Sequence, residues 1–254
     1  TWLALAGRGW GKTLAGANDM ASYGMAHPFS RLAIVARTIS DARDTCVEGE
    51  SGLLSCLPKG AIVSWNRSMG QLVLTNGTRY QLFSAEEPER LRGPQFHRAW
   101  SDEVGAWGRN AEERQWPPAW DMLQMCLRLG ADPQNVVTTT PRPTKLLRQL
   151  ISDPLTALTK GRTLENAANL APQFLDQIVK RYQGTRLGRQ ELDAEILDDV
   201  PGALWTWAML EDRRQAPDLT RAVVAIDPAV TSGEDSDETG IVVAGIGVDG
   251  RGFV

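Results

Sequence analysis

The most restrictive feature of the chain is a glycine-rich turn that directly follows its first apolar segment. Residues 3–6 predict a short buried strand, and residues 12–27 predict a helix. The turn between them matches the phosphate-binding pattern G-x-x-x-x-G-K-[ST] except at its first position, where Ala6 stands. In such a loop the backbone N–H groups surround a polyphosphate, the lysine reaches its outer phosphates and the hydroxyl binds Mg²⁺. The sequence therefore predicts an ATP site formed by Gly7, Arg8, Gly9, Trp10, Gly11, Lys12 and Thr13.

A glycine-rich turn without any ligand is the alternative. Strand and helix patterns alternate after the turn, which predicts an α/β fold with a doubly wound, mostly parallel sheet. Asn76-Gly77 predicts the tight turn of a hairpin. Strands are expected at 31–37, 62–65, 71–84 and 135–140 and in a segment ending at 100–103, and helices at 41–57, 87–91 and 117–129.

The last third of the chain has a different organisation. Residues 172–197 have a purely helical pattern, and a proline-containing segment separates them from a new strand at Arg221. Because the chain begins inside one strand and ends inside another, we expect a fragment. The predicted organisation is an α/β domain at 1–198 with a helical subdomain at about 165–198, a linker at 199–220 and the start of a second domain at 221–254.

Two acidic residues end the predicted strand of the segment FHRAWSDE. A P-loop ATPase needs a carboxylate at the end of another strand, to hold Mg²⁺ and to orient the attacking water. An Asp-Glu pair alone is a weak signal, because most such pairs are solvated. Beside a P-loop, we expect Asp102 to act on Mg²⁺ and its water and Glu103 to act as the catalytic base.

The next strand ends in the threonines Thr138, Thr139 and Thr140. β-Branched residues are ordinary in strands, so a structural role is an equal alternative. At the carboxyl end of a central strand, however, hydroxyls face the ligand crevice of an α/β sheet. We therefore expect them to contact the terminal phosphate.

Composition excludes several other classes of protein. The net charge of −4 gives no global sign of nucleic-acid binding, although a local basic patch would suffice for it. The three cysteines form no CxxC pair and suit a reducing compartment, and two histidines are too few for a histidine metal site. No apolar run approaches the roughly 20 residues of a membrane-spanning helix.

Taken in order, these motifs resemble those of the large terminase subunit of tailed bacteriophages, the motor that packages DNA into procapsids. The resemblance covers nearly the whole chain. It implies an ASCE-type P-loop ATPase domain followed by the first strands of an RNase H-like, metal-dependent nuclease domain. The segments that carry it are LAGRGWGKT, IVARTISDARD, SAEEPERLRGP, AWSDE, VVTTTPRPT, NLAPQFLDQIVKRY, GRQELDAEILDD and VVAIDPAVTSGEDSDETG.

The resemblance also assigns roles to individual residues. Arg8 would be the Walker A arginine, Arg92 the arginine finger offered to a neighbouring subunit, and Asp227 the first nuclease carboxylate, with Mg²⁺ or Mn²⁺ as its metal. An adenine-contacting segment ahead of Thr1 and further nuclease carboxylates after Val254 are implied as well. The ATPase roles are phosphate and Mg²⁺ binding for Lys12 and Thr13, the Walker B pair for Asp102 and Glu103, and coupling of hydrolysis to movement for Thr138–Thr140.

The implied partners are double-stranded DNA, a portal protein, a small terminase subunit and further copies of the chain in a ring, expected to be pentameric, on the procapsid. The implied location is the cytoplasm of the bacterial host, with no membrane partner, and the implied nuclease cuts concatemeric DNA. One alternative is another P-loop DNA motor, such as a DEAD-box helicase, which does not predict the segment IDPAVTSGEDSDETG. The other is a decayed prophage remnant, against which the intact Lys12, Asp102, Glu103 and Asp227 argue.

Tryptophans and basic clusters give weaker signals. Stacking on DNA is one interpretation of the tryptophans, but we expect packing roles for Trp116, Trp120, Trp205 and Trp207. The basic clusters at 145–148 and 180–189 predict solvated helix faces, with contacts to DNA phosphates as the alternative.

Overall fold

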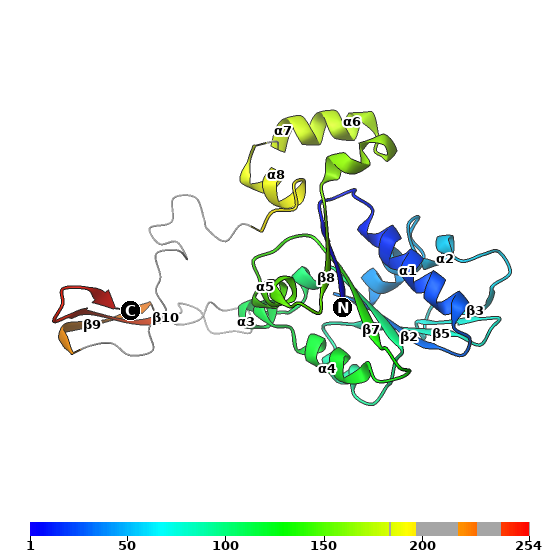
Figure 1. Ribbon diagram of the computed structural model, residues 1–254, viewed down its shortest axis with the longest axis horizontal. Coiled ribbons are helices and arrows are strands. Elements are labelled where there is room, and N and C mark those ends of the chain that lie inside the picture. Colours follow the sequence, from blue (N-terminus) through cyan, green and yellow to red (C-terminus); the bar gives the residue numbers. More distant parts are fainter. Residues whose placement is uncertain (183, 197–217, 228–239, 254) are drawn as a thin grey trace. The chain divides into compact units, whose positions relative to one another are not determined.

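The computed structural model describes residues 1–182, 184–196, 218–227 and 240–253. The chain divides into two compact units, Thr1–Asp198 and Asp199–Val254. The larger unit is built on one sheet with helices, and the smaller one contains a hairpin with a short third strand (Figure 1).

An eight-stranded sheet forms the larger unit, in the order β3-β4-β5-β2-β6-β7-β1-β8. Every neighbouring pair in the row β5-β2-β6-β7-β1-β8 is parallel. The pairs β3–β4 and β4–β5 are antiparallel. The predicted α/β fold with a mostly parallel sheet is therefore confirmed. The strands are β1 (Trp2–Ala6), β2 (Arg31–Ala36), β3 (Ile62–Asn66), β4 (Gln71–Leu74), β5 (Arg79–Ser84), β6 (Arg98–Asp102), β7 (Gln134–Thr139) and β8 (Ala157–Gly161).

Helices cover both faces of this sheet because alternate strand residues face opposite sides. On β2, Leu32 and Ile34 join one apolar cluster, whereas Ala33 and Val35 join the other. The first cluster includes α1 (Lys12–Ala26), η1 (Asp41–Val47) and α2 (Leu53–Cys56). The second includes η2 (Pro88–Leu91), η3 (Val104–Ala106), α4 (Pro118–Cys126) and α5 (Lys145–Ser152), and α3 (Ala111–Gln115) precedes α4 in the chain.

The helix predicted at 41–57 is wrong as a single element. The structure has a π-helical segment, η1, and a separate short α2, with turns between them. The chain folds back tightly there, so that a side chain at Gly49 would lie 2.6 Å from the Thr45 carbonyl oxygen and one at Gly52 would lie 2.7 Å from that of Val47. The apolar periodicity continued across the break, but the two glycines allow the chain to turn.

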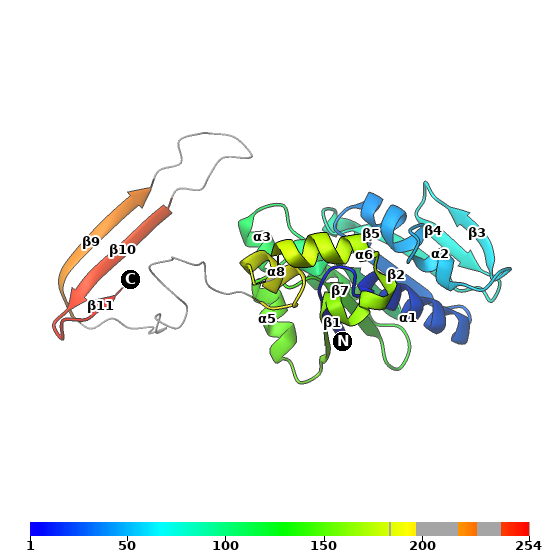
Figure 2. The same ribbon diagram turned by 90° about the horizontal axis from the view of Figure 1, so that it is seen from above.

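The sequence also missed β8, an edge strand parallel to β1. Beyond β8, the predicted helical run 172–197 is shorter and interrupted. It consists of α6 (Pro172–Phe174), η5 (Leu175–Val179), α7 (Lys180–Tyr182) and α8 (Arg186–Glu191), preceded by η4 (Thr163–Asn169). Figures 1 and 2 both place α6 and α8 over the end of β1, where the glycine-rich turn lies.

The smaller unit contains β9 (Leu219–Asp227), β10 (Gly240–Gly247) and β11 (Gly252–Phe253) in an antiparallel sheet. β9 and β10 pair along their whole length, with Asp227 opposite Gly240. The strand predicted to start at Arg221 is confirmed. The RNase H-like assignment stays a prediction, and most of the predicted linker 199–220 lies outside the described residues.

Candidate active site

The glycine-rich turn between β1 and α1 adopts conformations that suit an anion. Gly9 and Gly11 have φ angles of 75° and 110°, which glycine adopts without strain. Gly11 is the N-cap of α1, makes no side-chain capping bond and has open space on its Cα side. The first N–H groups of α1 therefore have no side-chain partner that would compete with a phosphate. The turn fits a polyphosphate.

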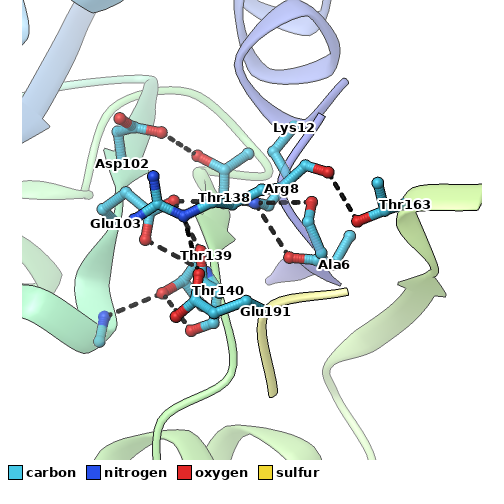
Figure 3. A network of polar contacts seen from close by, with 12 residues as sticks. Ala6, Arg8, Lys12, Asp102, Glu103, Thr138, Thr139, Thr140, Thr163 and Glu191 are labelled. Carbon is cyan, nitrogen blue, oxygen red and sulfur yellow. Dashed lines mark hydrogen bonds and ion pairs between the residues drawn. The ribbon is translucent and has the colours of Figure 1, made fainter. Parts of the chain in front are cut away.

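Lys12 begins α1 and is almost completely buried, with 8% of its surface exposed. Its Nζ donates to the carbonyl oxygens of Ala6 at 2.9 Å and Gly7 at 3.1 Å, and lies 3.8 Å from Glu103 Oε1 (Figure 3). Burial lowers the pKa of Lys12, and the nearby carboxylates of Glu103 and Asp102 oppose this shift. A buried cation thus stands between the turn and the carboxylates.

Asp102 ends β6 and is also buried, with 6% exposed. Its Oδ1 accepts a 2.6 Å hydrogen bond from Thr138 Oγ1, which itself accepts from Trp100 Nε1 at 2.7 Å. The Cys46 thiol is a further hydrogen-bond partner of this carboxylate. Burial raises the pKa of Asp102 to about 6, because the hydrogen bonds offset only part of the desolvation cost.

Glu103 stands directly after β6 in a left-handed conformation, with φ 49°, which is uncommon for a residue with a side chain. Its backbone N donates to the Thr138 carbonyl oxygen at 2.6 Å. Its carboxylate accepts from the backbone N of Thr140 at 3.2 Å and from Thr140 Oγ1 at 3.1 Å. The end of β7 therefore holds the Glu103 carboxylate on the side of Lys12 (Figure 3).

The three threonines do not share one position. Thr140 lines the cavity beside Glu103. Thr138 and Thr139 are fully buried and do not line it, so the expectation that all three hydroxyls face the phosphate is wrong for these two. Thr138 instead fixes Asp102, and Thr139 Oγ1 accepts from the Gly105 backbone N at 3.0 Å. The two neighbouring side chains point to opposite faces of the sheet, and both faces are covered, so both hydroxyls bond within the protein.

The helical subdomain closes over the glycine-rich turn through contacts that sequence reasoning missed. Arg8 Nε lies 2.9 Å from Glu191 Oε2, Thr163 Oγ1 donates to the Arg8 carbonyl oxygen at 2.7 Å, and Asn166 Nδ2 donates to that of Gly9 at 2.7 Å. These partners lie more than 150 residues from the turn in sequence, and no local sequence pattern predicts their contacts with it. Glu191 and Asn166, together with the turn, border a cavity of about 1320 Å³ that is also lined by Lys12, Thr13, Asp102 and Glu103.

The sequence model of the family described as terminase large subunit, T4likevirus-type, N-terminal, matches residues 3–212, which is most of the chain. The chain belongs to this family of large terminase subunits. No curated protein matches the chain in sequence.

Solved structures support the fold of this terminase chain. The large terminase ATPase domain of Thermus phage P74-26 matches with 17% identity and a TM-score of 0.56, over 77% of this chain and 88% of that one. A large terminase from a thermophilic bacteriophage, solved in complex with ADP, matches with 14% identity and a TM-score of 0.60, over 96% and 59%. The large terminase of bacteriophage HK97 matches with 15% identity and a TM-score of 0.58, over 99% and 57%. The terminase chain therefore spans less than three fifths of the latter two proteins.

Two predicted residues of the terminase chain are not among the residues that line the cavity. Arg92 follows η2 in an exposed turn, where its Nε lies 2.9 Å from Glu89 Oε2. Asp227 ends β9 in the smaller unit. No group of three metal-ligating side chains occurs among the residues that the structure describes, and none of the helices described there is long and apolar enough to cross a membrane.

Two tryptophans of the larger unit, Trp116 and Trp120, pack within the protein. Trp120 is 5% exposed within the core, and Trp116 packs against the same cluster while its Nε1 donates to Asp121 at 2.9 Å. The packing expectation is confirmed for these two. Trp205 and Trp207 lie outside the described residues.

Proposed function

We propose that this terminase chain hydrolyses ATP and that hydrolysis drives the movement of double-stranded DNA into procapsids. The observation that carries the proposal is the convergence of Lys12, Asp102 and Glu103 on one cavity at the ends of β1 and β6. The glycine-rich turn beside them has the backbone shape of a phosphate site. Membership of the large terminase family supplies the link to DNA packaging.

In the proposed ATP complex, the turn and Lys12 hold the phosphates. Nucleotide binding would draw Lys12 Nζ from the carbonyl oxygens of Ala6 and Gly7 to the phosphate oxygens. An ammonium group binds an anionic phosphate oxygen more strongly than a neutral carbonyl oxygen. Thr13 and Asp102 are the residues that would hold Mg²⁺. When bound, this ion neutralises charge on the phosphates.

Glu103 is the proposed base. Its carboxylate would take a proton from the water whose oxygen attacks the terminal phosphorus, as the bond to the leaving ADP oxygen breaks. Thr140 holds this carboxylate through two hydrogen bonds and so limits the directions from which it receives the proton. Arg8, which lines the cavity, is the proposed Walker A arginine.

Two substitutions separate binding from hydrolysis. Lys12→Ala removes the buried cation and should abolish measurable ATP binding, with Lys59→Ala as an exposed control. Glu103→Gln keeps the shape of the side chain, so ATP binding should persist while hydrolysis falls about 10²-fold or more. Calorimetry measures binding, and phosphate release in the presence of DNA measures hydrolysis.

Glu112→Gln is the matched control for Glu103→Gln, because Glu112 is exposed on α3 and does not line the cavity. It should hydrolyse ATP at the wild-type rate. Hydrolysis at that rate by Glu103→Gln would instead remove Glu103 from the role of base.

The remaining parts of the proposal rest on the family. They are a homo-oligomeric, pentameric ring on the procapsid, contacts with a portal protein and a small terminase subunit, and action in the cytoplasm of the bacterial host. Asp227 would belong to an RNase H-like nuclease that uses Mg²⁺ or Mn²⁺ to cut concatemeric DNA.

A further inference from the structure

The sheet order fixes the direction in which a nucleotide would lie along the turn. Glu103 and Thr140 follow β6 and β7, on one side of β1, whereas β8 lies on its other side. If the terminal phosphate lies beside Lys12 and Glu103, the nucleoside extends away from them, toward the segment that follows β8. The opposite arm of the cavity, beyond β6, is lined by the acidic side chains of Asp41 and Glu50 and by Arg37.

The segment after β8 offers apolar surface at the required place. Leu170 and Phe174 both line the cavity and are only partly buried. Leu170 packs on the turn itself, since a side chain at Gly9 would lie 3.0 Å from Leu170 Cδ2. A base stacks well on an aromatic ring and on an aliphatic side chain.

Two amide side chains beside this surface are oriented by the turn. The Gly9 carbonyl oxygen can only accept, so Asn166 must direct its Nδ2 toward it, at 2.7 Å. Asn166 Oδ1 then accepts from Asn169 Nδ2 at 2.8 Å. This chain of hydrogen bonds leaves Asn169 Oδ1 as an acceptor with no hydrogen-bond partner among the described residues.

We propose that Leu170 and Phe174 bind the base of the nucleotide and that Asn169 Oδ1 accepts a hydrogen bond from the 6-amino group of adenine. Guanine carries a carbonyl oxygen at that position. Because this oxygen and Asn169 Oδ1 are both acceptors, they could not form a hydrogen bond with each other. The subsite therefore favours ATP over GTP. It rests on the proposed ATP site.

Affinity measurements with three ligands test this subsite. The dissociation constants of ATP, GTP and inorganic tripolyphosphate are measured by calorimetry on the 254-residue chain with Mg²⁺. Phe174→Ala should weaken ATP binding about tenfold or more and leave tripolyphosphate binding unchanged, because tripolyphosphate has no base. Phe174→Tyr, which keeps the ring, should bind ATP within about twofold of wild type.

Asn169→Leu should lower the ratio of ATP to GTP affinity roughly three- to tenfold, the effect of one hydrogen bond. Ser51→Ala, in the opposite arm of the cavity, is the control and should change neither affinity. Retained ATP affinity in Phe174→Ala, or a ratio unchanged by Asn169→Leu, overturns the base subsite while the phosphate site stands. A wild-type chain that binds neither ATP nor tripolyphosphate overturns both proposals.

Discussion

Two features of its surroundings act in opposite directions on the charge of the Asp102 carboxylate. Burial in the sheet penalises its charge and raises its pKa to about 6, compared with an ordinary value of 3.8, whereas the hydrogen bond from Thr138 favours the charge. A metal ion would relieve the penalty, because it would add positive charge to that of the nearby Lys12. The buried carboxylate is therefore costly to the metal-free fold and useful to a metal site.

This cost predicts a pH dependence of stability in metal-free buffer. Between pH 4 and 6 the folded protein holds a proton on Asp102 that the unfolded chain releases, so the free energy of unfolding falls as the pH rises. Relative to Asp102→Asn, which has no such proton, wild type should lose up to about 3 kcal/mol over this range and change little above pH 7. Urea titrations at several pH values measure the difference, and a difference independent of pH would contradict the assignment.

The sequence motifs predicted the residues with chemical roles in the site but not the residues that hold them in position. Lys12, Asp102 and Glu103 could be predicted because each belongs to a short local pattern whose chemistry requires that residue type. Glu191 and Asn166 could not, because their contacts with the turn depend on how distant segments pack. The same limit applies to Thr138, whose direction depends on the pleat of β7.

At the scale of elements, α1 packs closely against β6 at Gly16. A side chain at Gly16 would lie 2.4 Å from the indole of Trp100, which is fully buried and cannot move aside easily. Gly16 thus lets the helix that begins at the phosphate turn rest on the strand that carries Asp102. The same indole donates to Thr138, so its position also supports the hydrogen bond to Asp102.

Gly16→Ala should therefore lower the free energy of unfolding by about 1–3 kcal/mol, although alanine favours helices more than glycine does. The loss arises because Trp100 or α1 must shift. Ser22→Ala, on the exposed face of the same helix, is the control and should stay within about 0.5 kcal/mol of wild type or be slightly stabilising. Equal denaturation midpoints for Gly16→Ala and wild type would show that the contact between residue 16 and Trp100 can accommodate a methyl group without loss of stability.

The elements themselves could be predicted where apolar patterns were long and bounded by strong signals. β1, α1 and β2 agree with their predictions to within a residue or so. β8 escaped because an exposed edge strand carries few apolar residues, and its pattern is only partly buried. The 41–57 segment misled because buried residues on both sides of a glycine turn imitate one continuous helix.

For the whole molecule, the exposed Arg92 could act on the ATP site of a neighbouring copy if several copies assemble. Arg92 lies outside the cavity of its own chain and is paired only with the exposed Glu89 among the described residues. An arginine finger acting in trans contributes roughly 10³–10⁵ to the rate. Mixing full-length Arg92→Ala with Lys12→Ala should then restore part of the ATPase, at interfaces that join an intact site to an intact Arg92. No recovery at any ratio, with both variants assembling normally, would place Arg92 in another role.

The smaller unit supports a prediction about DNA cutting. Two-metal nucleases hold ions roughly 4 Å apart between several carboxylates, and one aspartate cannot neutralise that charge. Asp227 stands at the end of β9 without two further ligands among the described residues. We therefore expect residues 1–254 not to cut DNA, and full-length protein to cut it with Mg²⁺ or Mn²⁺.

Asp227→Ala should abolish cutting by the full-length protein and leave its ATPase intact, because the two sites belong to different units. Asp249→Ala is the matched control, since Asp249 lies in the turn after β10, whereas the end of β9 pairs with the start of that strand. It should cut DNA as wild type does. Metal-dependent cleavage by the purified 254-residue chain, free of contaminating nuclease, would show that the ligands are already present within these residues, and the acidic segment that follows Asp227 would then be the place to look for them.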